Sequence, residues 1–505
     1  MTTESVEPRR LYRLSPLDRT GVLLGLSIVQ IIVTGTGITL GAIVMATANT
    51  IVGIAIAIIT TAIGVIRIHG EAVLHQLPTT IRYVRKGRSA SASSATWLAP
   101  LPILGPVTNP NSVPPALDRQ KLHHIDPTDF GVAPSELRGP VAMIIDKRAG
   151  LYAVTVRVAG RQFGLLESHE QDSQLAQWGN VIAQFVQERP IITQIHWSEW
   201  AAPAGINEHR DWLETHKSAQ PIADALKSWE QLIAESGPIA TRHEVLLTIT
   251  SHPSRIRTQR RHGSRHGATI EALLKETRAL LLRLDGAGLY AAALTPREHT
   301  RNLRLRLDPS IRATLDRREA LLGGAAGFVS DINSGPLATK ESWTSFATDN
   351  AIHRSFYVAE WPRLDVRSDW IRELMLWSGC VRSINVFFQP VPRSKSIRAI
   401  TAQATKIEAD MAHRTEKGFR VGASHRRAMQ GVTERDEELV AGFVELSYGG
   451  VVTVTATSVD ELDQASADIT QIAASVGIEL RPLHGRHAEA FIATLPVARG
   501  LRPRG

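Results

Sequence analysis

The chain has 505 residues, of which 43% are hydrophobic and 21% charged. This composition describes a chain that can bury cores, with room for two or three domains of ordinary size. Its single cysteine, Cys380, excludes an internal disulfide and agrees with a reducing compartment. Part of the formal net charge of +8 comes from Lys and Arg near the N-terminus, which suits an anionic inner leaflet better than nucleic acid.

Residues 21–68 are predicted to form a transmembrane helical hairpin. No side chain between Gly21 and Ile66 carries a charge. One helix over this stretch would be about 69 Å long at 1.5 Å per residue, about twice the ~30 Å hydrocarbon core of a bilayer. The polar segment from Ala46 to Thr50 therefore separates two spans. The alternatives are a signal peptide cleaved at this segment, whose apolar region would be shorter, and a hairpin buried in a soluble core.

Both flanks of the hairpin are rich in basic residues. They carry Arg9, Arg10, Arg13 and Arg19 before it, and Arg67, Arg82, Arg85, Lys86 and Arg88 after it. The positive-inside rule places both ends in the cytoplasm, so we expect a multi-pass protein of the inner (cytoplasmic) membrane with residues 1–20 as a cytoplasmic leader. Two G-x-x-x-G pairs, Gly21/Gly25 and Gly37/Gly41, are assigned to packing of the hairpin, with a homo-oligomer contact as the alternative.

Residues 69–138 are predicted to be a juxtamembrane segment and a Ser-, Ala- and Pro-rich linker. A helix from about Arg67 to Val84 is expected to continue off the membrane until Pro78 disturbs it. The composition from Gly87 to Pro115 indicates the linker. Folded structure is expected to begin near Gly139.

The remaining chain divides into a first α+β domain at 139–307, a connection at 308–345 and a second α+β domain at 346–505. The first domain is expected to have strands at 141–145, 152–158, 191–197, 245–249 and 289–294, with helices from Ser168, at 222–236, at 270–284 and from Pro296. The second is expected to have strands at 353–361, 381–388, 443–448, 451–457 and 478–483, with helices from Ser368, at 397–414, at 424–440 and from Ser458. This repeated order predicts two related α+β sandwich subdomains, each with helices on one face of a mostly antiparallel sheet.

No motif of a common hydrolase occurs in the chain. The sequence lacks G-x-x-x-x-G-K-[ST], H-E-x-x-H, G-x-S-x-G and paired C-x-x-C. His262 and His266 have the i, i+4 spacing of metal ligands, but the neighbouring glycines oppose a helix and no Cys or carboxylate lies in that loop. We therefore expect no catalytic residue, cofactor or metal, with an unusual nucleotide hydrolase as the alternative.

A basic loop between Ser251 and His266 is the candidate docking surface. It contains Arg255, Arg257, Arg260, Arg261 and Arg265, and no acidic residue. A solvated loop is the simplest interpretation, and a surface for an acidic partner or a membrane is the functional one. The loop contains no aromatic residue on which a base could stack, so direct binding of nucleic acid is not expected.

The C-terminal part resembles a known family. The stretch from Tyr448 to Leu501, with GGVVTVTATSVDELDQASADITQIAASVGIELRPLHG and then AFIATLPVARGL, is similar to the N-terminal, non-catalytic region of conjugation and type IV secretion ATPases of the VirB/TraC/TrbE class. The N-terminal hairpin resembles the small PrgI-type membrane proteins of Gram-positive conjugation systems. The resemblance implies an actinobacterial fusion of these two parts, in which the ATPase is a separate protein.

Together these features predict a non-enzymatic, membrane-anchored scaffold subunit of a conjugation or type IV-like secretion apparatus. Its expected partners are the lipid bilayer, a separate phosphate-loop ATPase, other membrane channel subunits and further copies of this chain. The alternative is a membrane component of a type VII secretion system, which would also have two N-terminal spans and a cytoplasmic domain.

Overall fold

The structure is a computed structural model that describes most of the chain. The described residues are 28–68, 71–89, 96–98, 117, 120–137, 139–146, 149–160, 166–188, 191–203, 213, 216–218, 222–236, 241–256, 264–321, 335–362, 364–418, 422–441 and 445–499. The expected leader at 1–20 lies outside these residues.

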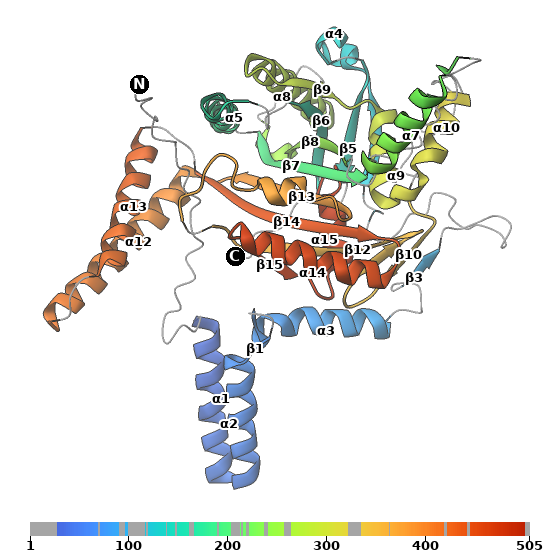
Figure 1. The fold of residues 1–505 in the computed structure, drawn as a ribbon. Helices are drawn as coiled ribbons and strands as arrows, with labels where there is room; N and C mark the ends of the chain where they lie inside the picture. Colours follow the sequence, from blue (N-terminus) through green and yellow to red (C-terminus); the bar gives the residue numbers. More distant parts are fainter. Residues whose placement is uncertain are drawn as a thin grey trace, which may run out of the picture.

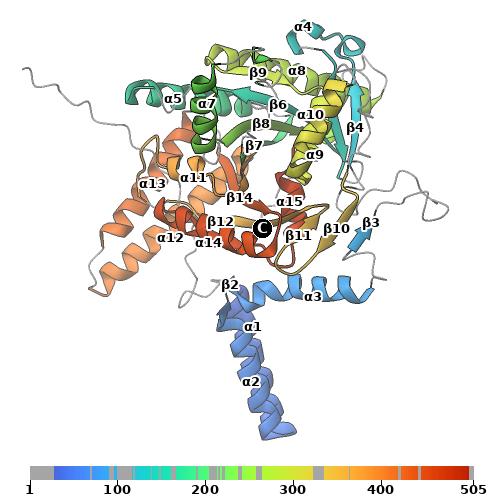
Figure 2. The ribbon, with the colours of Figure 1, turned by 45° about the vertical axis from the view of Figure 1, so that its right-hand side comes forward.

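The described N-terminal part consists of two packed helices followed by a third that runs crosswise. Helices α1 (Ile28–Thr47) and α2 (Thr50–Val65) form an antiparallel pair that projects away from the rest of the molecule (Figure 1). Two short strands, β1 (Arg67–Ile68) and β2 (Glu71–Ala72), follow, and α3 (Val73–Ser89) runs beneath the body in both views (Figures 1 and 2).

The prediction of a helix from about Arg67 to Val84 is therefore wrong at both ends. Residues 67–72 pair as strands, and the helix begins at Val73 and continues past Pro78 to Ser89. Pro78 is the sixth residue of this helix, where a proline has no N–H to donate to the preceding turn, but the helix continues through it to Ser89.

Within the described residues, all strands other than β1 and β2 belong to one 13-stranded sheet. Its members are β3 (Thr96–Leu98), β4 (Gln120–Ile125), β5 (Val141–Asp146), β6 (Leu151–Ala159), β7 (Ile192–Pro203), β8 (Thr241–Ser251), β9 (Tyr290–Ala293), β10 (Ala338–Glu341), β11 (Phe346–Thr348), β12 (Ala351–Glu360), β13 (Val381–Pro390), β14 (Leu446–Ala456) and β15 (Glu479–Pro482). The order is β3-β10-β11-β12-β14-β13-β7-β8-β6-β5-β4, with β15 beside β12 and β9 beside β6. All strand pairs described in the sheet are antiparallel.

The two halves of the chain meet in the middle of this sheet. Strand β13 pairs with β7 from Arg382↔Ala201 to Phe388↔Ile195. Strand β7 is longer than the predicted 191–197 segment and pairs along both of its edges, with β8 on one side and β13 on the other. The α+β class and the antiparallel pairing agree with the prediction, but the halves share one sheet where two sandwiches were expected.

Helices cover both faces of the sheet, where the sequence predicted helices on one face. The described helices of the body are α4 (Pro134–Leu137), α5 (Ser168–Glu188), α7 (Ala223–Ser236), α8 (Arg265–Gly286), α9 (Pro296–Leu307), α10 (Arg312–Leu321), α11 (Arg372–Leu376), α12 (Arg393–Glu416), α13 (Ala423–Val440), α14 (Val459–Ser475) and α15 (His487–Thr494), with 3-10 turns η2 (Pro127–Phe130), η4 (Pro253–Arg255) and η5 (Pro309–Ile311). On one face α8 packs over β5 to β8, and α11 and α14 pack over β12 to β15. On the other face lie α9, α10 and α15.

The side chains of β5 point alternately into two hydrophobic cores, one on each face of the sheet. Val141, Met143 and Ile145 face the core under α8, whereas Ala142 and Ile144 face the core under α9 and α15. All of these side chains are buried, so β5 is apolar on both faces. A strand that is buried on both sides needs such a continuous apolar run.

Strand β14 corrects the hairpin predicted around Gly449 and Gly450. It is one continuous strand from Leu446 to Ala456 that pairs with β13 from Leu446 to Thr455, through both glycines. A Cβ atom on Gly450 would lie 2.5 Å from Cγ2 of Val358 and 2.9 Å from Cζ2 of Trp361. The glycine therefore makes room for neighbouring side chains inside a strand, which is a known use of glycine in sheets.

Two further boundaries differ from the prediction. Folded structure begins before Gly139, because β4 at Gln120–Ile125 pairs with β5 in the same sheet. The expected connection at 308–345 contains α10 and β10. Between β13 and β14 the chain leaves the sheet as the paired helices α12 and α13, which project from the body as an arm (Figure 1).

Candidate functional site

The helices α1 and α2 approach one another closely through glycines. A Cβ atom on Gly41 would lie 2.7 Å from the carbonyl oxygen of Gly53, and one on Gly53 would lie 2.5 Å from the carbonyl oxygen of Gly41. A Cβ on Gly37 would overlap the side chain of Thr60. Small residues that let two backbones meet are typical of helix pairs in lipid. Gly21 and Gly25 lie outside the described residues.

Several polar groups of the hairpin are paired inside it, although the buried hydroxyl of Thr34 has no hydrogen-bond partner among the described residues. The side chain of Gln30 is 4% exposed, and its Nε2 donates to the carbonyl oxygen of Gly64 over 2.7 Å. The hydroxyls of Thr36 and Thr60 donate to carbonyls one turn back in their own helices. At the turn, Oδ1 of Asn49 accepts from the first main-chain N–H groups of α2. Such internal pairing is what a segment needs where water is absent.

The outer surface of the hairpin is apolar. Its exposed side chains include Ile32, Ile38, Leu40, Ile43, Ile51, Ile54, Ile58 and Ile59. By length and composition, Val29–Thr47 is long and apolar enough to cross a membrane, while Thr50–Val65 is apolar but shorter. A contiguous exposed apolar surface of this kind marks contact with lipid or with another protein.

Helix α3 is joined to both the hairpin and the body. At its start, the main-chain N–H of Val73 donates to the carbonyl oxygen of Ile66 over 3.0 Å. Further along, Tyr83 meets Trp343 edge-on, with ring centroids 5.2 Å apart. The indole of Trp343 stacks on His484 and leaves no space for a Cβ on Gly485, whose φ is +66°. The contact with α3 therefore rests on a tightly packed part of the body.

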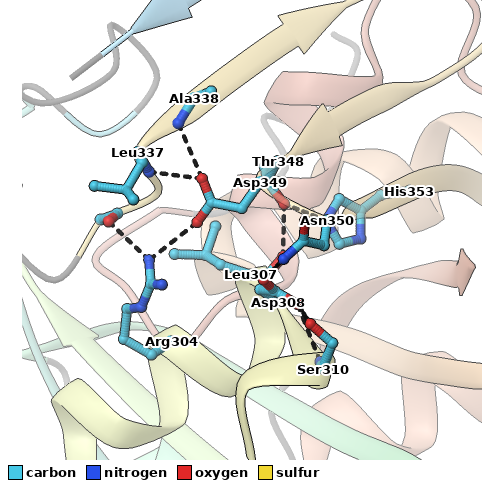
Figure 3. A network of polar contacts seen from close by, with 11 residues as sticks. Arg304, Leu307, Asp308, Ser310, Leu337, Ala338, Thr348, Asp349, Asn350 and His353 are labelled. Atoms are coloured by element: carbon cyan, nitrogen blue, oxygen red, sulfur yellow. Dashed lines mark hydrogen bonds and ion pairs between the residues drawn. The ribbon is translucent and has the colours of Figure 1, made fainter. Parts of the chain in front are cut away.

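A polar network joins the end of α9 to the strands β10, β11 and β12 (Figure 3). The carboxylate of Asp349 accepts from the N–H groups of Leu337 and Ala338 over 2.7 and 2.9 Å, and it pairs with Arg304 over 3.3 Å. Asp349 has a φ of +46°, a backbone conformation that non-glycine residues adopt rarely. The contacts of its carboxylate hold this strained turn in place, so the network is an element of structure.

A second part of the network fixes the protonation of His353. The hydroxyl of Thr348 donates to the carbonyl oxygen of Leu307 over 2.6 Å, so it accepts from Nε2 of His353 at 2.8 Å. Nδ1 of His353 then accepts from Thr455, 2.9 Å away. Burial lowers the pKa of His353 to about 3, which keeps the ring neutral at physiological pH. It also lowers the pKa values of His196, His299 and His487 to about 3.

A buried ion pair lies near the junction of β7 and β13. Glu199 and Arg382 are fully buried, with Nη2 of the arginine 3.6 Å from Oε1 of the carboxylate. Nδ1 of His243 lies 2.6 Å from the same oxygen, and Arg382 also donates to the carbonyl oxygens of Met375 and Trp377 near the end of α11. These partners tie α11 to the sheet.

The basic loop is only partly described. Arg255 lies in η4 and Arg265 is the first residue of α8, and both are exposed. Arg257, Arg260 and Arg261 lie outside the described residues. Ser264 caps α8, and Nδ1 of His266 lies 2.8 Å from the Tyr152 hydroxyl. His266 thus lies in a helix, where the sequence predicted none, and its contact is with the core strand β6.

The described residues contain no group of three or more His, Cys, Asp or Glu side chains that could hold a metal ion. A hollow of about 10 Å³ lies between Leu117, Ile144, Leu303 and Val497. Such a volume holds at most about one water molecule, too little for a substrate.

Sequence reasoning did not find the polar network, because its members come from residues 304–353 and from β14 and share no motif. The position of Asp349 before Asn350, between β11 and β12, was the one local signal of a tight turn. No protein-family model matches the chain, and a search of curated proteins finds no match.

Proposed function

We propose that this chain is a multi-pass protein of the cytoplasmic membrane and acts as a non-enzymatic scaffold. The observation that carries this proposal is the helical hairpin, which is uncharged, is apolar on its outside and pairs the side chains of Gln30, Thr36 and Thr60 internally. In water, that exposed apolar surface would be unfavourable by about 25 cal/mol per Å². Insertion into a bilayer removes the cost.

The second helix is short for a span. Sixteen residues at 1.5 Å per residue cover about 24 Å, compared with ~30 Å of hydrocarbon. Local thinning of the bilayer and a snorkelling Arg67 accommodate such a mismatch at modest cost. Both helices then cross together, and the large α+β body stays on the side where the chain leaves the hairpin.

The proposed role follows from the resemblance to conjugation proteins. The body carries neither a phosphate loop nor another hydrolase motif in its sequence, so we assign energy transduction to a separate phosphate-loop ATPase. The body would hold that ATPase, and other channel subunits, at the membrane. Arg255, Arg257, Arg260, Arg261 and Arg265 are the proposed docking residues.

Affinity purification from detergent-solubilised membranes tests this role, with co-purifying proteins identified by mass spectrometry. We expect recovery of a phosphate-loop ATPase that lacks its own N-terminal region, and loss of that ATPase when all five arginines become glutamine. A variant with exposed Arg398 and Arg426 of the projecting arm changed to glutamine is the control for loss of basic side chains elsewhere on the surface. Recovery of type VII components would overturn the assignment, and equal recovery from the five-arginine variant would overturn the docking site.

Membrane insertion is tested separately. Carbonate at high pH should leave the wild-type chain in the membrane pellet. Ile58 is 63% exposed on the outside of α2, so Ile58→Asp would place a charge in the lipid and should shift the chain to the supernatant. Release of the wild-type chain by carbonate would contradict insertion.

A further inference from the structure

Helix α3 is held at the level where the hairpin ends. The hydrogen bond from Val73 to Ile66 connects its first residue to the residue that follows α2. From there it turns aside and lies between the hairpin and the body in both views (Figures 1 and 2). If the hairpin is inserted as proposed, α3 lies at the membrane surface and along its plane.

The two sides of α3 differ in character. Tyr83 contacts Trp343 and so marks the side that faces the body. At 100° per residue, Leu74 and Ile81 lie on the opposite side, with Leu77 and Val84 next to them. Ile81 is 47% exposed and Val84 is 42% exposed. An apolar stripe with spacings of three and four residues thus faces away from the body.

Basic residues accompany this stripe. The helix contains no acidic residue and carries Arg82, Arg85, Lys86 and Arg88 in its C-terminal half. Arg85 lies on the same side as Ile81, and Arg82 lies beside it; both are exposed. Long basic side chains keep their charge near lipid phosphates while their stems cover apolar surface. A helix with an apolar stripe and flanking cations is the form that lies in the interface of an anionic membrane.

We propose that α3 is an interfacial helix that binds anionic lipid headgroups and sets the orientation of the body on the membrane. The apolar stripe enters the boundary between headgroups and acyl chains, about 5–10 Å deep. Arg82 and Arg85 contact lipid phosphates. Through Tyr83 and Trp343 the body then has a fixed face toward the bilayer, while the hairpin alone would leave it free to rotate.

The test uses the full chain with Cys380→Ser, reconstituted into vesicles of phosphatidylcholine with or without phosphatidylglycerol. Single cysteines at Ile81, Thr79 and Ile58 carry an environment-sensitive fluorophore, and the vesicles contain spin-labelled lipids as quenchers. Thr79 lies on the side of α3 away from the apolar stripe and is the matched control. We expect severalfold stronger quenching at Ile81 than at Thr79, strongest with a spin label near the headgroups, and strong quenching at Ile58 by a deep label.

The outcomes separate this inference from the proposed function. Quenching at Ile58 with equal signals at Ile81 and Thr79 would overturn the interfacial helix and leave the inserted hairpin intact. Absence of quenching at Ile58 would overturn both. The third outcome is that the emission of the fluorophore at Ile81 shifts with protein concentration and is not quenched by the lipids. This would assign the stripe to a second copy of the chain and overturn the lipid contact.

The proposed contact with anionic headgroups is tested by a separate experiment. Changing Arg82, Arg85, Lys86 and Arg88 to glutamine should reduce quenching at Ile81 severalfold in vesicles with phosphatidylglycerol, and salt should have the same effect on the wild-type chain. Equal quenching in both kinds of vesicle, with and without the four substitutions, would overturn the role of anionic lipid.

Discussion

Replacing Gly53 by alanine should push α1 and α2 apart. A Cβ atom at this position would lie 2.5 Å from the carbonyl oxygen of Gly41 and 2.7 Å from the backbone nitrogen of Met45. These are backbone atoms, so no side-chain rotation can relieve the clash. A separation of about 1 Å is needed to restore ordinary contact, and overpacking of this kind costs about 1–3 kcal/mol.

The matched control is Gly35→Ala. Gly35 lies in the same pair of helices, and a Cβ atom there would meet nothing within 4 Å. Alanine raises helix propensity over glycine by about 1 kcal/mol at both sites, so this gain cancels when the two variants are compared. The difference between them isolates the steric cost of the close approach.

A disulfide across the helix pair measures that cost. The Cβ atom of Thr34 would lie 3.6 Å from a Cβ on Gly64, which is within the range of disulfides. With Thr34→Cys, Gly64→Cys and Cys380→Ser in every variant, titration against glutathione gives the effective concentration of one thiol at the other. We expect Gly53→Ala to lower it about 5- to 150-fold relative to Gly35→Ala, the equivalent of about 1–3 kcal/mol. Equal values for the two variants would refute close packing through these glycines.

Three further predictions concern the body. Replacing residues 392–444 by an Asn-Gly turn should change the melting temperature by no more than a few degrees, because Pro390 and Leu446 are already paired neighbours; loss of cooperative melting would contradict this. His353 has a folded-state pKa of about 3, against an ordinary 6.5, so the unfolded chain binds a proton that the folded chain does not, and stability falls as pH drops below 6.5. Denaturant titrations between pH 7 and 5 should show that His353→Gln reduces this fall by up to about 1.4 kcal/mol per pH unit, and an unchanged slope would refute a buried neutral ring. Burial raises the pKa of Cys380 to about 12, so its thiol should react with a maleimide at pH 8 far more slowly in the folded chain than in denaturant, and equal rates would contradict that burial.

Local signals in the sequence were sufficient for many single elements. Ser458 does cap a helix, with its side chain accepting from the N–H of Glu461. Pro296 does open a helix, and there Thr295 and Glu298 form a capping box. The hairpin of β5 and β6 turns at Gly150, whose φ of +66° suits glycine. In each case the residues that specify the element lie within a few positions of one another.

Contacts between distant segments could not be found in this way. Pairing of β7 with β13 joins residues such as Ala201 and Arg382, and alternation along each strand does not identify its partner. The continuous apolar run of β5 is what a strand buried on both faces needs, but it does not identify the helices that cover those faces. Gly450 was interpreted as a turn because a single sequence does not show Val358 and Trp361 beside it.

The sequence predicted the candidate site only where the amino-acid composition of a stretch was unusual. The uncharged stretch and its basic flanks are visible in the sequence, and they carry the membrane proposal. The stripe on α3 was obscured, because Pro78 suggested an interruption that the structure does not have. The network around Asp349 depends on Arg304, which is brought close by the fold alone.

The shared sheet also determines the order in which this protein can fold during synthesis. Strand β7 has no partner for its second edge until β13 leaves the ribosome. The core beside β4 needs Phe491 and Ala498, and the side chain of Gln120 accepts a hydrogen bond from the N–H of Ala498 over 3.1 Å. Contacts this distant in sequence slow folding. The hairpin is made before all of these segments. If it is inserted as proposed, the growing chain would be tethered to the membrane with an open sheet edge until its last segments arrive.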